Sequence, residues 1–330
     1  MNAKSSQPLA PTTNAPGASP TGRWIAAAAL ALCAAYPLIG GNAFEYHVAI
    51  MVCIAAIATG GLAIIAWVGQ LSLAHGAFVG IGAYCSTLLV TRLGMPVMVG
   101  LPAAAIVAGL VAYAIGSPLL RLRGVYFVLI TFALNELFRL AMLAFPGISG
   151  GSSGLANIPP ISLFGMALES KQSVYIFALG CLAVVMALMW LLRRGPMGRA
   201  FASVEENLVL AESAGVPTAR VQSIAFTIGS AIAGFAGAIM AHYIGFISPE
   251  TFAFQLSVSY VIMLVVGGRL ALFGALLGAL FLTPLPEFLR GIEQYQHIAY
   301  GVILIVVLRF LPRGLMSLSD RLRTAKGDQA

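Results

Sequence analysis

Charged side chains are scarce in this sequence. Asp, Glu, Lys and Arg make up 9% of its 330 residues, whereas soluble domains carry about a quarter. So few charges cannot coat the surface of a soluble particle of this length, and 60% of the residues are hydrophobic. The composition excludes a soluble globular protein and indicates an all-α polytopic membrane protein.

Several chemical motifs are also missing. The four cysteines form no C-x-x-C pair and lie in apolar stretches, where we interpret them as packing residues. No G-x-x-x-x-G-K-[ST] phosphate loop is present, so the chain cannot bind ATP in the P-loop manner. No Lys/Arg run of the nucleic-acid type occurs either. The sequence therefore predicts no metal, no cofactor bound by this chain and no nucleic-acid partner.

Long apolar runs fill most of the chain. A bilayer core about 30 Å thick requires about 20 apolar residues per helix, and counting such stretches predicts about ten spans, within a range of eight to ten. The short stretches 256–268 and 271–286 meet at Gly267-Gly268-Arg269 and are also compatible with one broken hairpin. The predicted spans are 24–40, 46–68, 71–91, 96–118, 124–145, 173–192, 222–243, 256–268, 271–286 and 296–311.

The basic residues favour one orientation of these spans. With the N-terminus inside, Arg92, Arg139, Lys171 and Arg290 fall outside, which leaves 14 of the 18 Lys and Arg residues on the cytoplasmic side. This positive-inside bias places both termini in the cytoplasm. Merging 256–286 into one span would put the basic C-terminal tail on the outside.

The segments divide the chain into three predicted parts. Residues 1–22 are rich in Ala, Pro, Thr, Ser and Asn and are predicted to be a disordered cytoplasmic tail. Residues 23–312 form the membrane domain, and 313–330 a basic cytoplasmic tail. Two loops interrupt the membrane domain: 146–171 outside, rich in Gly, Ser and Pro, and 193–221 inside.

The inside loop 193–221 carries the pattern of a short amphipathic helix. Ser203 followed by Glu206 fits a capping box, and Gly215 fits the position after a helix end. Phe201, Val204, Leu208 and Ala211 recur at helical spacing, leaving acids on the other face. We interpret Ser203–Gly215 as a docking helix for a soluble cytoplasmic protein, although a structural loop with a solvated face is the simpler alternative. Its candidate docking residues are Ser203, Glu205, Glu206, Asn207, Leu208, Glu212 and Gly215.

Polar and small residues inside the spans are candidates for a translocation path or for helix packing. Small residues recur every fourth position, as at Gly229 and Gly237, which lets helix backbones approach closely in lipid. Glu136 and Arg139 are three residues apart and can pair on one helix face. His75 has no metal-ligand partner at helical spacing and is interpreted as a structural or path-lining residue. The candidates are Gln70, Ser72, His75, Gly76, Gly80, Asn135, Glu136, Gly229 and Gly237.

Two other classes of protein remain open on the residues alone. An ion-coupled secondary transporter of a small polar metabolite requires intramembrane acids, and Glu136 is the one deep candidate. An integral membrane enzyme is the more remote alternative. It rests on "GGSSG" at 150–154, which fits the G-x-S-x-G hydrolase pattern with Ser152 at its centre and His242 or His297 as an imagined base.

Three stretches resemble one known family in their order along the chain. "GRAFASVEENLVLAESAGVPTARVQSIAFTIGSAIAGFAGAIMAHY" resembles the cytoplasmic loop and following helix of the permease subunits of branched-chain amino-acid ABC importers. "GQLSLAHGAFVGIGAY" resembles a motif of the same family. "RLRGVYFVLITFALNELFRL" followed by "GGSSGL" is similar to its LivM, or M-type, variant. The resemblance runs from about residue 45 to 315.

The resemblance implies a non-catalytic subunit of an ATP-driven importer in the bacterial inner membrane. Such a subunit forms half of a pore with a second, H-type permease and transports by alternating access. Two ATP-binding subunits would hold ATP-Mg and dock on the cytoplasmic loops, with Ser203–Gly215 as the coupling helix. An extracytoplasmic binding protein would deliver the amino acid, with branched-chain amino acids as the default substrate.

Overall fold

The computed structural model describes residues 42–122, 124–163 and 166–288, together with 301, 305 and 309. The predicted spans 24–40 and 296–311 and both predicted tails fall largely or wholly outside these residues. The long helices, in chain order, are α2 (Ala43–Ala66), α3 (His75–Leu93), α4 (Val97–Leu119), α5 (Val125–Ala144), α7 (Lys171–Arg194), α10 (Thr218–Ile244) and α11 (Phe254–Gly267). The shorter ones are α6 (Pro146–Ser149), α8 (Pro196–Glu206), α9 (Leu208–Ser213), α12 (Gly274–Leu282) and α13 (Leu285–Phe288).

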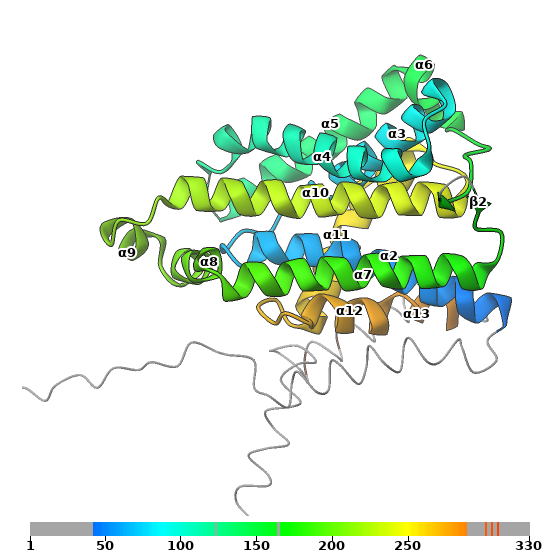
Figure 1. Cartoon of the computed structure of the whole chain (residues 1–330). Coiled ribbons are helices and arrows are strands. Elements are labelled where there is room, and N and C mark those ends of the chain that lie inside the picture. The colour runs from blue at the N-terminus through cyan, green and yellow to red at the C-terminus, as the bar shows by residue number, and fades with distance from the viewer. Residues whose placement is uncertain are drawn as a thin grey trace, which may run out of the picture.

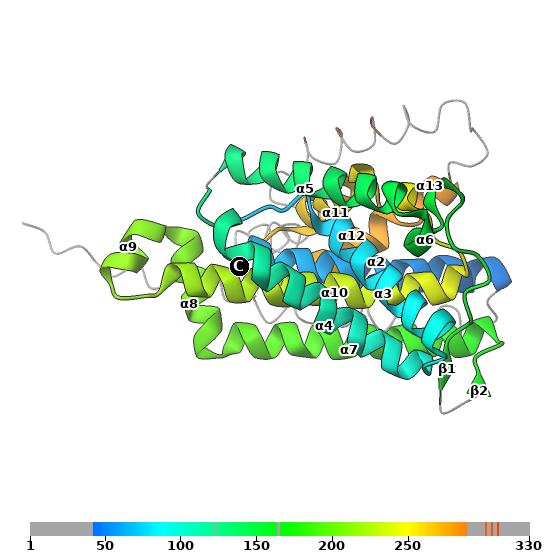
Figure 2. The same cartoon turned by 90° about the horizontal axis from the view of Figure 1, so that it is seen from above.

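Helix α10 runs through the middle of the bundle. In Figure 1, α3, α4 and α5 lie on one side of it, and α2, α7 and α12 on the other. Seen from above in Figure 2, α10, α2 and α3 occupy the centre while α5 and α7 lie at opposite margins. Helix α10 packs most extensively on α4, α3 and α2. These four helices therefore form the core on which the peripheral helices rest.

Glycine allows these helix backbones to touch. A side chain added at Gly229 would meet the carbonyl oxygen of Gly61 on α2, and one added at Gly237 would meet that of Val79 on α3. On a third side of α10, a Cβ at Gly234 would lie 2.8 Å from the Ala104 carbonyl oxygen of α4. Helices in lipid associate through close backbone approach of this kind. Lipid tails are as apolar as the side chains, so no hydrophobic effect drives the helices together.

The helices are those of a multi-pass membrane protein. Within the described ranges, seven helical segments are long and apolar enough to cross a bilayer, the last extending over Pro249–Gly267. They correspond to the predicted spans from 46–68 to 256–268. The total of about ten remains a prediction, as does the side of the membrane on which the termini lie.

Helices α11 and α12 form a tight hairpin at the predicted break. Gly268 has φ +117, a backbone conformation that favours glycine. A Cβ at Gly267 would collide with the carbonyl oxygen of Gly274, and one at Gly278 with that of Met263. The region predicted as 271–286 is divided between α12 and α13, which are shorter than a bilayer-spanning helix.

The two ends of the bundle differ in structure. Helices α8 and α9 project from one end, and α6 and strand β2 lie at the other (Figure 1). The second end contains a two-stranded antiparallel hairpin, β1 (Ser162–Leu163) and β2 (Met166–Ala167), which the sequence did not predict. Mutual backbone hydrogen bonds between Leu155 and Ile247 fasten the 146–171 segment to the chain that follows α10. The two predicted loops therefore lie at opposite ends of the molecule.

We expect Gly237→Ala to destabilise the bundle, because the added methyl group would overlap the backbone of α3. Overpacking of this kind costs about 1–3 kcal/mol. The matched control is Gly180→Ala on α7, where a Cβ meets nothing within 4 Å. Thermal unfolding of the purified chain in detergent measures both variants. An unchanged midpoint for Gly237→Ala would contradict this packing.

Candidate functional site

The predicted docking helix is two helices with a sharp break between them. Helix α8 begins at Pro196, a residue suited to the first helical position, and α9 begins after Asn207. The Asn207 Oδ1 accepts hydrogen bonds from the backbone N–H groups of Val209 and Leu210 at 3.0 and 3.1 Å. The prediction that Ser203 caps the helix is therefore wrong, because Ser203 lies inside α8 and its hydroxyl donates to the Ala200 carbonyl.

Helix α9 ends at a glycine in the left-handed backbone conformation. Gly215 has φ +82, and the next residue, Val216, donates from its backbone N–H to the Ala211 carbonyl at 2.9 Å. This six-to-one bond satisfies a carbonyl that the end of the helix leaves free. Val216 and Pro217 then lead directly into α10, so the position of α9 is tied to that of the central helix.

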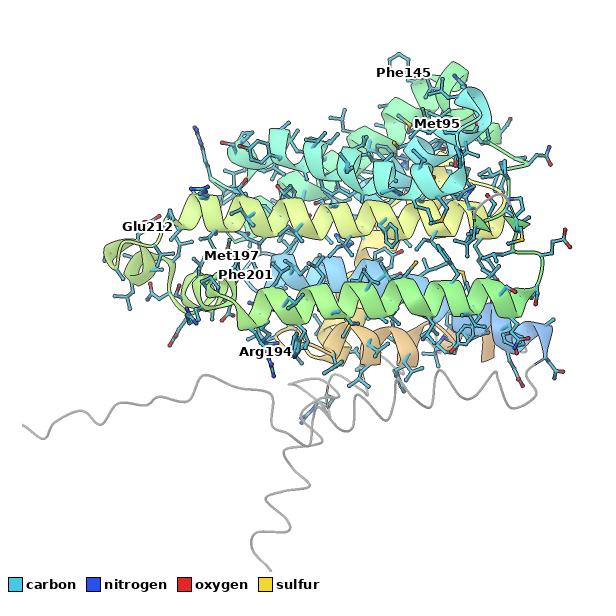
Figure 3. The ribbon with its side chains drawn as sticks, in the orientation of Figure 1. Met95, Phe145, Arg194, Met197, Phe201 and Glu212 are labelled. Carbon is cyan, nitrogen blue, oxygen red and sulfur yellow. The ribbon has the colours of Figure 1, made fainter. Side chains whose placement is uncertain are left out.

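One face of the α8–α9 pair is anchored to the bundle. Phe201 and Val204 of α8 and Ala211 of α9 are buried, and Leu208 is half-buried. Figure 3 shows Phe201 and Met197 on α8 close to the bundle, with Glu212 on the side of α9 near the start of α10. The apolar row read from the sequence thus holds the two helices against the membrane domain.

The opposite face is exposed and is not purely acidic. Glu206, Asn207 and Glu212 are exposed, and beside them α9 exposes two large apolar side chains. Val209 is 61% and Leu210 66% accessible. The sequence pattern predicted no role for either residue, although both lie off the buried row of the helix. Two adjacent exposed apolar side chains on a fixed element with a polar rim make this face a candidate protein-docking surface.

Glu205 does not face outward as the sequence suggested. Its Oε1 pairs with the guanidinium of Arg269 at 2.9 Å, and Arg269 lies in the turn between α11 and α12. Arg193, at the end of α7, donates to the Leu270 carbonyl of the same turn at 2.6 Å. Glu205 therefore links α8 to the α11–α12 hairpin, a contact across 64 residues that no local pattern signals.

The polar stretch before α3 forms a buried, non-helical connection. The expected helix start at residue 71 is wrong by four residues, since α3 begins at His75. Ser72 is fully buried and its hydroxyl oxygen accepts from the Ala74 N–H at 3.2 Å. Gln70 is also buried. His75 Nε2 donates to the Ala58 carbonyl at 2.7 Å, whereas its Nδ1 has no partner among the described residues.

Neighbouring helices cap the first turn of α3. Asn135 of α5 accepts from the Ala77 N–H at 2.8 Å, and Ser257 of α11 accepts from the Gly76 N–H at 2.7 Å. The Asn135 amide also donates to the Phe252 carbonyl at 3.1 Å. Because lipid offers no hydrogen bonds, each free N–H of a helix start must find such a partner within the protein. Asn135 therefore fastens α3, α5 and the start of α11 together.

The predicted ion pair on α5 is part of a larger charged cluster. Arg139 Nε donates to Glu136 at 2.8 Å, and its Nη1 donates to Glu250 at 2.7 Å. Glu250 lies in the short 3₁₀ helix η3 (Pro249–Phe252), 111 residues away in sequence. The two acidic side chains and one basic side chain leave the cluster with one net negative charge on the partly exposed face of α5.

The small candidate residues all lie at helix contacts. A Cβ at Gly76 would come within 2.9 Å of the Ser257 hydroxyl, and one at Gly80 within 2.9 Å of the Phe252 ring. Gly229 and Gly237 face α2 and α3, as described above. Close helix packing thus accounts for glycine at these four positions, because a side chain there would collide with a neighbouring helix or segment. Their role in a translocation path remains a prediction.

The G-x-S-x-G match does not form a hydrolase site among the described residues. Ser152 is exposed in a 3₁₀ turn, η2 (Gly151–Ser153), and not in the strand–turn–helix setting that the motif requires. His242 is engaged elsewhere: its Nδ1 donates to the Pro159 carbonyl at 2.7 Å, so its Nε2 accepts from the Ser86 hydroxyl at 2.8 Å. His297, the other imagined base, lies outside the described residues.

These features define a class: a multi-pass helical membrane protein with an amphipathic helix pair, α8 and α9, at one end and a charged cluster on a membrane helix. The family model for the permease component of branched-chain amino acid transport systems matches residues 46–308. The chain belongs to this family of ABC transporter permeases, and within it to the LivM type. It is a transport subunit and not an enzyme.

Curated relatives agree with this placement. The chain is 31% identical to the high-affinity branched-chain amino acid transport system permease protein LivM of Salmonella typhimurium and to that of Escherichia coli K12, covering 79% of this chain and 68% of each relative. It is 30% identical to the autoinducer 2 import system permease protein LsrC of Escherichia coli O9:H4, over 58% of this chain and 56% of that protein. No solved structure matches.

We expect Ser257→Ala to lower the stability of the chain, because it removes the acceptor of a buried N–H at the start of α3. A buried donor without a partner costs about 1–3 kcal/mol. Ser259→Ala, two residues further along α11, is the matched control, since the Ser259 hydroxyl bonds only to its own helix. Thermal unfolding in detergent compares the two. Equal midpoints would show that the cross-helix cap contributes nothing.

Proposed function

We propose that this chain is one of two permease subunits of an ATP-driven importer of branched-chain amino acids in the bacterial inner membrane. A second, H-type permease would complete the pore, two ATP-binding subunits would hydrolyse ATP-Mg, and an extracytoplasmic binding protein would deliver the substrate. Family membership supports this arrangement, and the named function of the LivM relatives supports the substrate class.

The observation that carries the proposal is the exposed apolar pair on α9. Val209 and Leu210 project from an element whose other face is fixed to the membrane domain. An apolar patch held rigidly among polar residues suits insertion into a groove of a soluble partner. The proposed partner is the ATP-binding subunit, with Glu206, Asn207 and Glu212 forming the polar rim.

The contacts behind this element give the proposed route of movement. Helix α8 continues from α7 through Gly195, and Glu205 ties it to the α11–α12 turn. A push on α8 and α9 would therefore reach α7, α10 and the hairpin together. Such a coupled displacement of packed helices is the kind of motion that alternating access requires.

The proposed path runs along the charged face of α5. Ionisable groups in membrane helices usually face protein or water, because exposure to lipid is costly. The cluster of Glu136, Arg139 and Glu250 therefore favours a position against the partner permease or the aqueous path. Since Glu136 is already paired with Arg139, it is less suited to carry a coupling proton, which disfavours the ion-coupled transporter as the alternative.

We expect Leu210→Asp to weaken association with the ATP-binding subunits and to reduce ATP-dependent leucine uptake about tenfold or more, because it places a charge in the apolar patch, and loss of one of the few anchors that dominate an interface costs about 2 kcal/mol or more. The control is Met166→Asp, the same kind of change at an exposed residue in β2 at the opposite end. Co-purification and uptake into vesicles holding the full complex measure both effects. Undiminished co-purification of the ATP-binding subunits with Leu210→Asp would refute the docking surface.

We also expect Arg269→Glu to impair uptake while leaving ATPase association intact. The substitution places a second carboxylate against Glu205 and breaks the link between α8 and the hairpin. The double exchange Arg269→Glu with Glu205→Arg should restore part of the lost uptake. Uptake that is unaffected by the single exchange, or not recovered by the double one, would remove this ion pair from the proposed route.

A further inference from the structure

A wide groove opens beside α9, where the end of α4 meets the start of α10. Its volume is about 1030 Å³, and its lining combines residues of these three helices with the turn that follows α4. The groove lies at the same end of the bundle as the docking element but is formed mostly by other residues. Its polar lining residues include Ser117, Arg121, Thr218, Arg220 and Gln222.

The groove carries an uncompensated positive charge. Neither Arg121 nor Arg220 forms an ion pair with a carboxylate in the part of the chain that the structure describes. Glu212 also lines the groove, and its Oε1 accepts from the Thr218 hydroxyl at 2.7 Å. Two arginines and one glutamate leave a net charge of +1, with both guanidinium groups available to an anion.

The backbone at the start of α10 and the Gln222 side-chain amide add further hydrogen-bond donors to the groove. The first turn of α10, Thr218 to Arg220, lines the groove, and the helix start at Pro217 has no side-chain cap. The N-terminus of a long helix bears free N–H groups and a partial positive charge, which together favour an anion. The Gln222 side chain also lines the groove. It is only 5% exposed, and no described residue pairs with its amide, so a buried hydrogen-bonding group is left for a ligand.

An apolar row on α4 leads away from this anion site. Ile106, Leu110 and Tyr113 recur at helical spacing, are all strongly exposed, and lead to the groove at Tyr113 and Ser117. From Tyr113 to Ile106 the row spans about 10 Å of helix. One leaflet's hydrocarbon layer is about 15 Å thick, so an acyl chain held by its headgroup in the groove would lie along this row.

We propose that the groove binds the phosphate headgroup of an anionic phospholipid of the inner leaflet, with an acyl chain along α4. The leaflet assignment rests on the proposed function, which places the α8–α9 end in the cytoplasm. Basic pockets between membrane helices on that side suit anionic headgroups. Arg121, Arg220, the start of α10 and the Gln222 amide hold the phosphate, and the apolar row distinguishes a lipid from free phosphate.

The test uses the purified full-length chain in vesicles of phosphatidylcholine, with and without phosphatidylglycerol. Native mass spectrometry of the extracted protein measures the lipid that stays bound. We expect phosphatidylglycerol to be retained by the natural chain and bound about thirtyfold more weakly by Arg121→Gln with Arg220→Gln, given about a fivefold loss for each arginine near a lipid surface. Arg199→Gln, an exposed arginine of α8 outside the groove, should bind it normally.

A second variant covers the case in which the arginine substitutions disturb the fold. Ser117→Phe fills the groove without changing its charge and should also release the lipid. Inorganic phosphate at matched concentration tests the free anion and should not displace phosphatidylglycerol. Full displacement by phosphate or equal retention in every variant would overturn the proposal. Because no transport is measured, the result is independent of the importer assignment.

Discussion

Close contact between the backbone of α10 and three other helices is the constraint on which the rest of the structure depends. In a bilayer, apolar side chains have no reason to leave lipid, so helices associate through tight packing and hydrogen bonds. Gly229, Gly234 and Gly237 place α10 against α2, α4 and α3 at backbone distance. Since α9 leads directly into α10, the proposed docking helices α8 and α9 take their position from this core.

Buried polar groups give the bundle its second set of constraints. Helix α3 begins inside the protein, and its first N–H groups depend on Asn135 of α5 and Ser257 of α11. This arrangement fixes α5 to the core at Asn135, one residue before Glu136. The same helix can therefore present a charged face outward while its other face is held in place.

The end of the molecule that carries α8 and α9 combines two surfaces of opposite character. Val209 and Leu210 form an exposed apolar tip suited to a protein partner, whereas Arg121 and Arg220 line a basic groove suited to an anionic headgroup. Glu212 lies between them and is hydrogen-bonded to Thr218 at the start of α10. In the proposed importer, lipid and ATP-binding subunit would thus contact the same helix start from two sides.

Composition and apolar runs determined that this is a helical membrane protein, where seven of its spans lie and that the 193–221 loop is amphipathic, because these properties depend on neighbours along the chain. The structure corrected one local detail, because Asn207 caps α9 whereas Ser203 lies inside α8, which begins at Pro196. It alone paired Glu205 with Arg269 and Arg139 with Glu250. Such partners are brought together by helix packing across many residues, and no local pattern of residues encodes that packing.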